Sequence, residues 1–195
     1  MDATATTPVV RHERRVAARR SRIRFGAPGL VLCGLGLLLL GAWGGIVPFV
    51  GPKFGFGPVG APAWQWTNAN VVLNVVPGVA AVLAGLAVMG SASWRALRGL
   101  AAFGSLLAVG AGAWFVLGEL VYPVFYGTAP VWGGTAGNGA LAQFVTRLGY
   151  GMGVGLALCL LGGMALALIA ARRAEALITR ESMVAEDVAA PPATV

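Results

Sequence analysis

Glu119 is the side chain of this sequence best suited to chemistry, because it is an acid within a long apolar stretch. No other acidic residue lies between Glu13 and Glu175. Ionisable groups in such stretches are costly to bury and often functional. Arg147 is its natural partner if the two stretches form antiparallel helices. Three roles stay open for Glu119: an ion pair that fixes a hairpin, a group that handles a proton or ligand, and a solvated interfacial carboxylate.

Two short series of polar side chains have helical spacing. Asn70 and Asn74 are four residues apart, and Gln143, Arg147 and Tyr150 follow one another at spacings of four and three. Each series therefore occupies one face of a helix. The series either converge with Glu119 on a small polar pocket or form hydrogen bonds between helices, which contribute about 0.6 kcal/mol each in a membrane. The candidate polar cluster is Asn70, Asn74, Glu119, Gln143, Arg147 and Tyr150.

Aromatic side chains gather in and beside two segments rich in Gly and Pro, 51–68 and 122–140. Only Phe25, Trp94 and Phe103 lie toward the opposite ends of the apolar stretches. Ordinary aromatic belts populate both membrane interfaces, so this distribution predicts a cap on one face. The cap is either a structural lid or a surface that binds a lipid, a glycan or a partner protein. Its candidate residues are Trp43, Phe54, Phe56, Trp64, Trp66, Trp114, Tyr122, Tyr126 and Trp132.

The sequence lacks the motifs of the common catalytic sites, including HExxH, the Walker phosphate loop and the nucleophile elbow. Cys33 and Cys159 lie in separate apolar runs, and the single histidine, His12, lies among arginines. A metal site usually needs three or four ligands near one another. We therefore expect no catalytic, cofactor-binding or metal site, and a protein that is not an enzyme.

Four long apolar stretches must position these residues. The chain has 195 residues, of which 57% are hydrophobic and only 11% charged, whereas soluble domains carry about 25% charged residues. A helix needs about 20 apolar residues to cross a bilayer, and lipid does not satisfy an open backbone. We predict an all-α protein, a transmembrane four-helix bundle. Its spans are 28–50, 69–90, 99–121 and 141–170, within a membrane domain of residues 28–170.

The arginines predict how the spans are oriented. Seven of them lie in the first 24 residues, and others follow the second and fourth spans. Loops rich in Arg and Lys stay in the cytoplasm. The basic arm 1–27 and the tail 171–195 are therefore expected in the cytoplasm of a multi-pass protein of the cell membrane, with residues 182–195 disordered. Because the positive charge is confined to such flanks, no nucleic-acid partner is expected.

A weak internal repeat is visible. Gly41-Ala42-Trp43 in the first span matches Gly112-Ala113-Trp114 in the third. This predicts two parallel hairpins related by an axis along the membrane normal, although chance in a chain rich in Gly and Ala explains the match as well. GxxxG spacings such as Gly41 and Gly45 favour tight helix packing and permit a homo-oligomer.

The segment Gly-Ala-Trp-Gly-Gly-Ile-Val-Pro-Phe-Val-Gly-Pro at 41–52 is followed by Phe54, Phe56 and Trp64-Gln65-Trp66. In this pattern the chain resembles small uncharacterised four-span membrane proteins of high-GC actinobacteria. The resemblance covers the first hairpin best, and it implies no activity and no functional residues.

The sequence thus favours a non-enzymatic membrane protein with an aromatic outer cap, a binding or scaffold component of the cell envelope. Its partners would be membrane lipids, a partner protein or a second copy of the chain. The alternative is a small oligomeric transporter or channel that uses Glu119 and Arg147 at its outer mouth. A membrane enzyme is the third class.

Overall fold

The computed structural model describes residues 8–54, 63–93, 97–127 and 140–189, which form helices and no strand. Four α-helices carry most of this part of the chain: α1 (Pro8–Val50), α3 (Val76–Ser93), α4 (Arg98–Tyr126) and α6 (Gly153–Ala189). The shorter elements are a 3₁₀ turn (Gly51–Phe54), α2 (Asn68–Asn70), α5 (Ala140–Arg147) and two π-helices (Val71–Val75 and Leu148–Met152).

Within the described ranges, four helical segments are long and apolar enough to cross a membrane: Pro28–Phe54, Asn68–Ala92, Gly99–Tyr126 and Leu148–Met183. Their exposed surfaces carry large aliphatic and aromatic side chains such as Leu83, Phe103 and Leu160. These side chains would be unfavourable in water and are solvated by lipid tails. The chain is therefore a multi-pass membrane protein built as a helical bundle.

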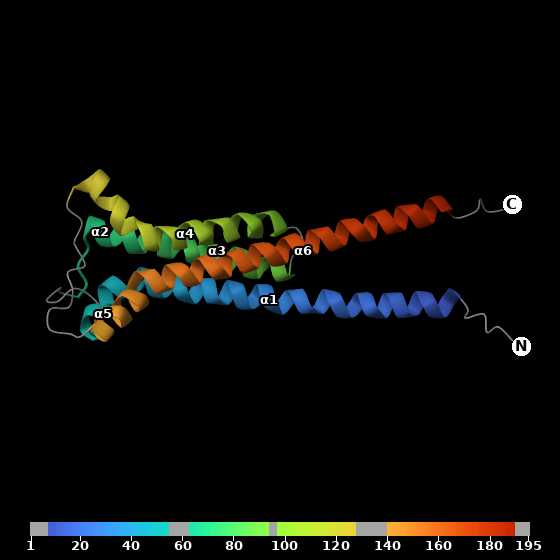
Figure 1. Cartoon of the computed structure of the whole chain (residues 1–195), viewed down its shortest axis with the longest axis horizontal. Coiled ribbons are helices and arrows are strands. Elements are labelled where there is room, and N and C mark those ends of the chain that lie inside the picture. Colours follow the sequence, from blue (N-terminus) through green and yellow to red (C-terminus); the bar gives the residue numbers. More distant parts are fainter. Residues whose placement is uncertain (1–7, 55–62, 94–96, 128–139, 190–195) are drawn as a thin grey trace, which may run out of the picture.

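The four long helices form a closed ring in which α1 packs on α3 and α6, and α4 packs on the same two helices. The core at their centre consists of small and medium side chains, among them Leu37, Ala81, Ala108 and Leu158, all fully buried. We call the end of the bundle that holds α2 and α5 the aromatic end. We call the opposite end, from which both α1 and α6 project, the arginine end (Figure 1).

Glycines let the helices of each hairpin touch through their backbones. A Cβ atom added to Gly78 of α3 would lie 2.7 Å from the Cα of Gly45 and 2.8 Å from the carbonyl oxygen of Gly41 in α1. In the second hairpin, a Cβ at Gly155 of α6 would lie 2.6 Å from the carbonyl oxygen of Gly112 in α4. Such approaches are possible only for glycine, so both hairpins are held by the same kind of contact.

The same contact recurs in each hairpin seven residues closer to the arginine end. Gly85 of α3 faces the carbonyl oxygen of Gly34, and Gly162 of α6 faces the carbonyl oxygen of Ser105. The two hairpins thus repeat a series of contacts in the same order and spacing. The match at Gly-Ala-Trp therefore belongs to a structural repeat of two hairpins.

The two π-helices occupy equivalent places, each just before the long helix that returns from the aromatic end. In the first one the N–H of Val76 donates to the carbonyl oxygen of Val71, and Pro77 has no N–H to offer the next carbonyl. The carbonyl oxygen of Val72 is left free, and it accepts a hydrogen bond of 2.9 Å from the indole Nε1 of Trp114.

The second hairpin is bound to the first by the equivalent bond. Trp43 Nε1 donates to the carbonyl oxygen of Gly149, in the second π-helix, at 2.8 Å. Each Gly-Ala-Trp tryptophan therefore bonds a π-helical carbonyl of the opposite hairpin. These two reciprocal bonds are what an approximate twofold axis along the bundle would produce.

Two predicted features of the C-terminal half differ from the structure. Residues 182–189 were expected to be disordered, but α6 remains helical to Ala189, and residues 190–195 lie outside the described part. The fourth span was expected to begin at residue 141. The chain is helical without a break from Ala140 to Ala189, but α5 and the second π-helix come first, and the segment that is apolar enough to cross a membrane begins at Leu148.

Candidate functional site

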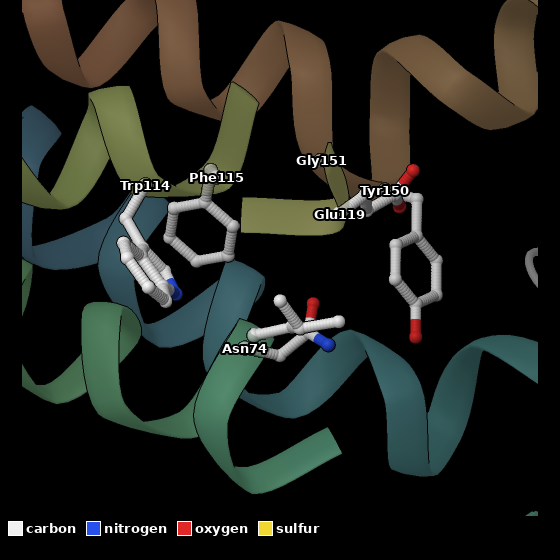
Figure 2. Close-up of a pocket in the computed structure, with 7 residues that line it drawn as sticks. Asn74, Trp114, Phe115, Glu119, Tyr150 and Gly151 are labelled. Carbon is white, nitrogen blue, oxygen red and sulfur yellow. The ribbon is translucent and has the colours of Figure 1, made fainter. Parts of the chain in front are cut away.

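A small pocket lies at the aromatic end, among residues from both hairpins. Its volume is about 10 Å³, which is room for about one water molecule or one group of that size. Figure 2 shows Asn74 between the Trp114 and Phe115 rings on one side and the Tyr150 ring on the other, with Glu119 beside Tyr150. The lining residues are Leu73, Asn74, Trp114, Phe115, Glu119, Tyr150 and Gly151.

The π-helices place two of these side chains in the interior of the bundle. Leu73 and Tyr150 occupy the same position in the first and second π-helix, and both are buried. Asn74 and Gly151 are the next residues of the two π-helices. The pocket thus forms where the two hairpins meet. At equivalent positions the first hairpin contributes the amide of Asn74, and the second contributes Gly151, which has no side chain.

Asn74 is the most informative residue of the pocket. Its side chain is 4% exposed, and among the described residues its amide makes no hydrogen bond with another protein group. A buried polar group without a partner costs roughly 1–3 kcal/mol. The amide lines the pocket, so a molecule in the pocket would supply the missing bonds.

Glu119 brings a carboxyl group to the same pocket from α4. Arg147 at the end of α5 and the phenol of Tyr150 both lie within electrostatic range of it. The expected ion pair between Glu119 and Arg147 is not a direct contact within 4.0 Å in the part of the chain that the structure describes. Both side chains are exposed in the isolated chain, so they remain open to a third group.

Aromatic rings form the walls. The N–H of Trp114 is already bound to Val72, so Trp114 presents only its apolar ring to the pocket. The Phe115 ring lies against Gly44 of α1, where a Cβ atom would approach it to 2.6 Å. This contact across the centre of the bundle closes the pocket toward the arginine end.

The other predicted polar residues lie elsewhere. Asn70 bonds the residues just before its own helix. Its Nδ2 donates to the carbonyl oxygen of Gln65 at 2.9 Å, and its N–H donates to Oγ1 of Thr67, the N-cap residue, at 3.1 Å. It does not line the pocket. Gln143 belongs to α5, but its side chain lies outside the described residues. Asn74, Glu119 and Tyr150 are thus brought together, with Arg147 beside them.

The predicted aromatic cap is divided into local groups. Phe49 packs against Trp66 at a ring separation of 4.6 Å and against Trp64 at 5.9 Å. Tyr122 and Tyr126 stack at 4.8 Å on α4. Phe54 is exposed on the 3₁₀ turn, and Trp43 and Trp114 bind the π-helices as described. Phe56 and Trp132 lie outside the described residues.

Trp64 has an unusual backbone. Its φ of 63° is a left-handed conformation that is rare for large side chains. Its N–H donates to the carbonyl oxygen of Phe49 at 3.1 Å, which ties the chain back to the end of α1. The strained turn places the Phe49, Trp64 and Trp66 rings together at the aromatic end.

Sequence reasoning missed three lining residues: Leu73, Phe115 and Gly151. Phe115 lies four residues before Glu119 and therefore shares its helix face, which was a usable signal. Leu73 and Gly151 enter the pocket through the π-helices, and no local pattern indicated those. Within the described ranges no group of three His, Cys, Asp or Glu side chains is close enough to hold a metal ion.

We compared the chain with protein-family models, with curated proteins and with solved structures, and found no match in any of the three.

Proposed function

We propose that the chain is a non-enzymatic protein of the cell membrane that binds an envelope lipid by its headgroup, in the pocket of the aromatic end. The observation that carries this proposal is the buried amide of Asn74, which lines the pocket and has no hydrogen-bond partner among the residues that the structure describes. A headgroup that enters from the membrane surface would satisfy it. A carboxyl group and three aromatic rings complete a site with few, convergent polar groups.

The distribution of arginines supports an outward-facing pocket. Arg98, Arg172 and Arg173 lie at the arginine end, together with the basic part of α1. By the positive-inside rule that end is cytoplasmic, which leaves the aromatic end on the outer side of the membrane. Exposed rings such as Trp64 and Trp66 then sit at the outer interface, where tryptophan is favourable.

Packing below the pocket favours binding over transport. Fully buried residues such as Leu37, Ala108 and Leu158 fill the centre of the bundle. The hydroxyl groups of Ser91 and Ser105 are bound to carbonyl oxygens of their own helices, so they offer no polar path. Among the described residues, the pocket lining also holds one carboxyl group and no cysteine, serine or histidine, which favours a binding role over catalysis.

The test is native mass spectrometry of the full chain purified from membranes in mild detergent. Gly151→Leu should fill the pocket and remove a retained lipid mass. The matched control is Gly163→Leu, because Gly163 is exposed on α6, which continues from the π-helix of Gly151, and no described atom lies within 4 Å of its Cβ position. Equal lipid retention in both variants, or retention of a protein in place of a lipid, would refute the proposal.

A further inference from the structure

The chemistry of the pocket narrows the class of headgroup. A ligand must be small at its tip, since the space suits a group of about the size of water. It must donate hydrogen bonds, because the Glu119 carboxylate only accepts them, and the Asn74 amide can accept one while donating others. It must also pack favourably against the aromatic ring faces of Trp114 and Phe115.

We propose that the pocket binds the primary ammonium group of a zwitterionic phospholipid, with Arg147 holding the adjacent phosphate. This inference rests on the proposed function and names the ligand class of the same site. A primary ammonium is a compact cation with three N–H donors. Its donors match the Glu119 carboxylate and the Asn74 carbonyl oxygen, and the aromatic walls attract a cation through their faces.

Charge balance supports this assignment. Glu119 lies inside a membrane span, where an unpaired carboxylate is costly. The guanidinium group of Arg147 acts on it from α5 without a direct contact within 4.0 Å among the described residues. An ammonium in the pocket gives Glu119 a closer counter-charge and leaves Arg147 free to bind a phosphate.

The order of the two charges along the bundle matches the order of the headgroup. Arg147 ends α5 and precedes Tyr150 of the pocket by almost one turn, and it is exposed. In an ethanolamine phospholipid, two carbons separate the ammonium from the phosphate. The ammonium can therefore reach Glu119 while the phosphate remains beside the guanidinium group, which is well suited to bind it.

The size of the pocket makes a selective prediction. Three methyl groups on the nitrogen remove all its donors and enlarge it well beyond the space of one water molecule. Phosphatidylethanolamine should therefore bind more tightly than phosphatidylcholine, although both carry one positive and one negative charge. Phosphatidylglycerol can satisfy Arg147 but brings no cation to Glu119.

The experiment uses the delipidated full chain in mild detergent, with each of the three lipids added at equal concentration and bound lipid counted by native mass spectrometry. We expect phosphatidylethanolamine to bind roughly ten- to hundredfold more tightly than phosphatidylcholine, the range that a charge-assisted hydrogen bond contributes. Glu119→Gln should abolish this preference, and Asn74→Leu should weaken it.

The matched control is Glu175→Gln, which removes an exposed acid of α6 at the arginine end and should leave the preference unchanged. Arg147→Gln should weaken phosphatidylethanolamine and phosphatidylglycerol alike, since both present a phosphate. A stoichiometric complex with soluble phosphoethanolamine, but none with the phospholipid, would show that the source is not a lipid and would overturn the proposal.

Equal binding of the ethanolamine and choline lipids would overturn the ammonium assignment, and so would a preference that survives Glu119→Gln. If lipid binding still depends on Gly151 in that case, the proposed function stands and only the headgroup class is wrong. If Gly151→Leu also leaves lipid binding unchanged, both proposals fail together.

Discussion

The glycine contacts within each hairpin give a quantitative prediction for Gly78→Ala. The added Cβ would lie 2.7–2.8 Å from three backbone atoms of α1, at Gly41 and Gly45. Carbon atoms pack best at about 3.5–4.0 Å, and backbone atoms cannot swing away as side chains do. The two helices must therefore move apart by a sizeable fraction of an ångström along a tightly packed seam.

Overpacking of this kind costs about 1–3 kcal/mol. Alanine also stabilises a helix relative to glycine by up to about 1 kcal/mol, which partly hides the packing cost. Gly163→Ala measures this gain in helix propensity alone, since no described atom lies within 4 Å of the added carbon. The difference between the two variants isolates the packing cost, and we expect it to be about 1–3 kcal/mol.

The assay is reversible unfolding of the purified chain in mixed micelles of increasing SDS content, followed by tryptophan fluorescence. The internal repeat adds a second requirement: Gly155→Ala, which meets the carbonyl oxygen of Gly112, should lose stability to a similar extent as Gly78→Ala. If both variants were as stable as Gly163→Ala, the backbone contact between the helices of each hairpin would not exist.

The remaining predictions use the same unfolding assay. Trp43→Phe and Trp114→Phe should each lower the free energy of unfolding by about 0.5–1.5 kcal/mol, because each removes one indole hydrogen bond, and a loss at only one position would contradict the reciprocal arrangement. Asn74→Leu should leave the free energy of unfolding unchanged or raise it by up to about 2 kcal/mol, because it removes a buried amide that has no partner in the described part of the chain. Asn70→Ala should lower it by roughly 1 kcal/mol through the lost bond to Gln65; a larger loss for Asn74→Leu than for Asn70→Ala would show that Asn74 has a protein partner after all.

The main features of the fold could be predicted from the sequence, because they depend on length and composition. An apolar stretch such as 99–121 is long enough to cross a bilayer whatever its neighbours are. The repeat was visible at Trp43 and Trp114 because both tryptophans have the same structural role. The helical course of residues 182–189 was missed because the segment 182–195 ends in Ala-Pro-Pro-Ala-Thr-Val, a terminal composition that favours disorder.

The pocket was only partly predictable. Asn74 and Tyr150 were found because helical spacing groups polar side chains on a face, and Glu119 because its charge is out of place in an apolar stretch. The helical spacing wrongly placed Asn70 in the pocket. Its amide instead donates to the carbonyl oxygen of Gln65, and such a local bond cannot be predicted from periodicity.

The π-helices were not predictable from local pattern. The missing N–H of Pro77 helps to free the Val72 carbonyl, but the bond that stabilises this register comes from Trp114 on another helix. Directly after the second π-helix, a Cβ at Gly153 would clash with the carbonyl oxygen of Leu148, so a glycine is needed there. The register of each π-helix thus depends on a tertiary contact and on one residue that lacks either an N–H or a side chain.

The central claim is that the aromatic end, with its pocket, faces out of the cell while α1 and α6 project into the cytoplasm. Single cysteines at Phe54 and Ser182, both exposed, test it in a chain whose Cys33 and Cys159 are replaced by alanine. With a membrane-impermeant maleimide applied to intact cells, Phe54→Cys should be labelled at once and Ser182→Cys only after the membrane is permeabilised. Labelling of Ser182→Cys in intact cells, with Phe54→Cys protected, would contradict the account.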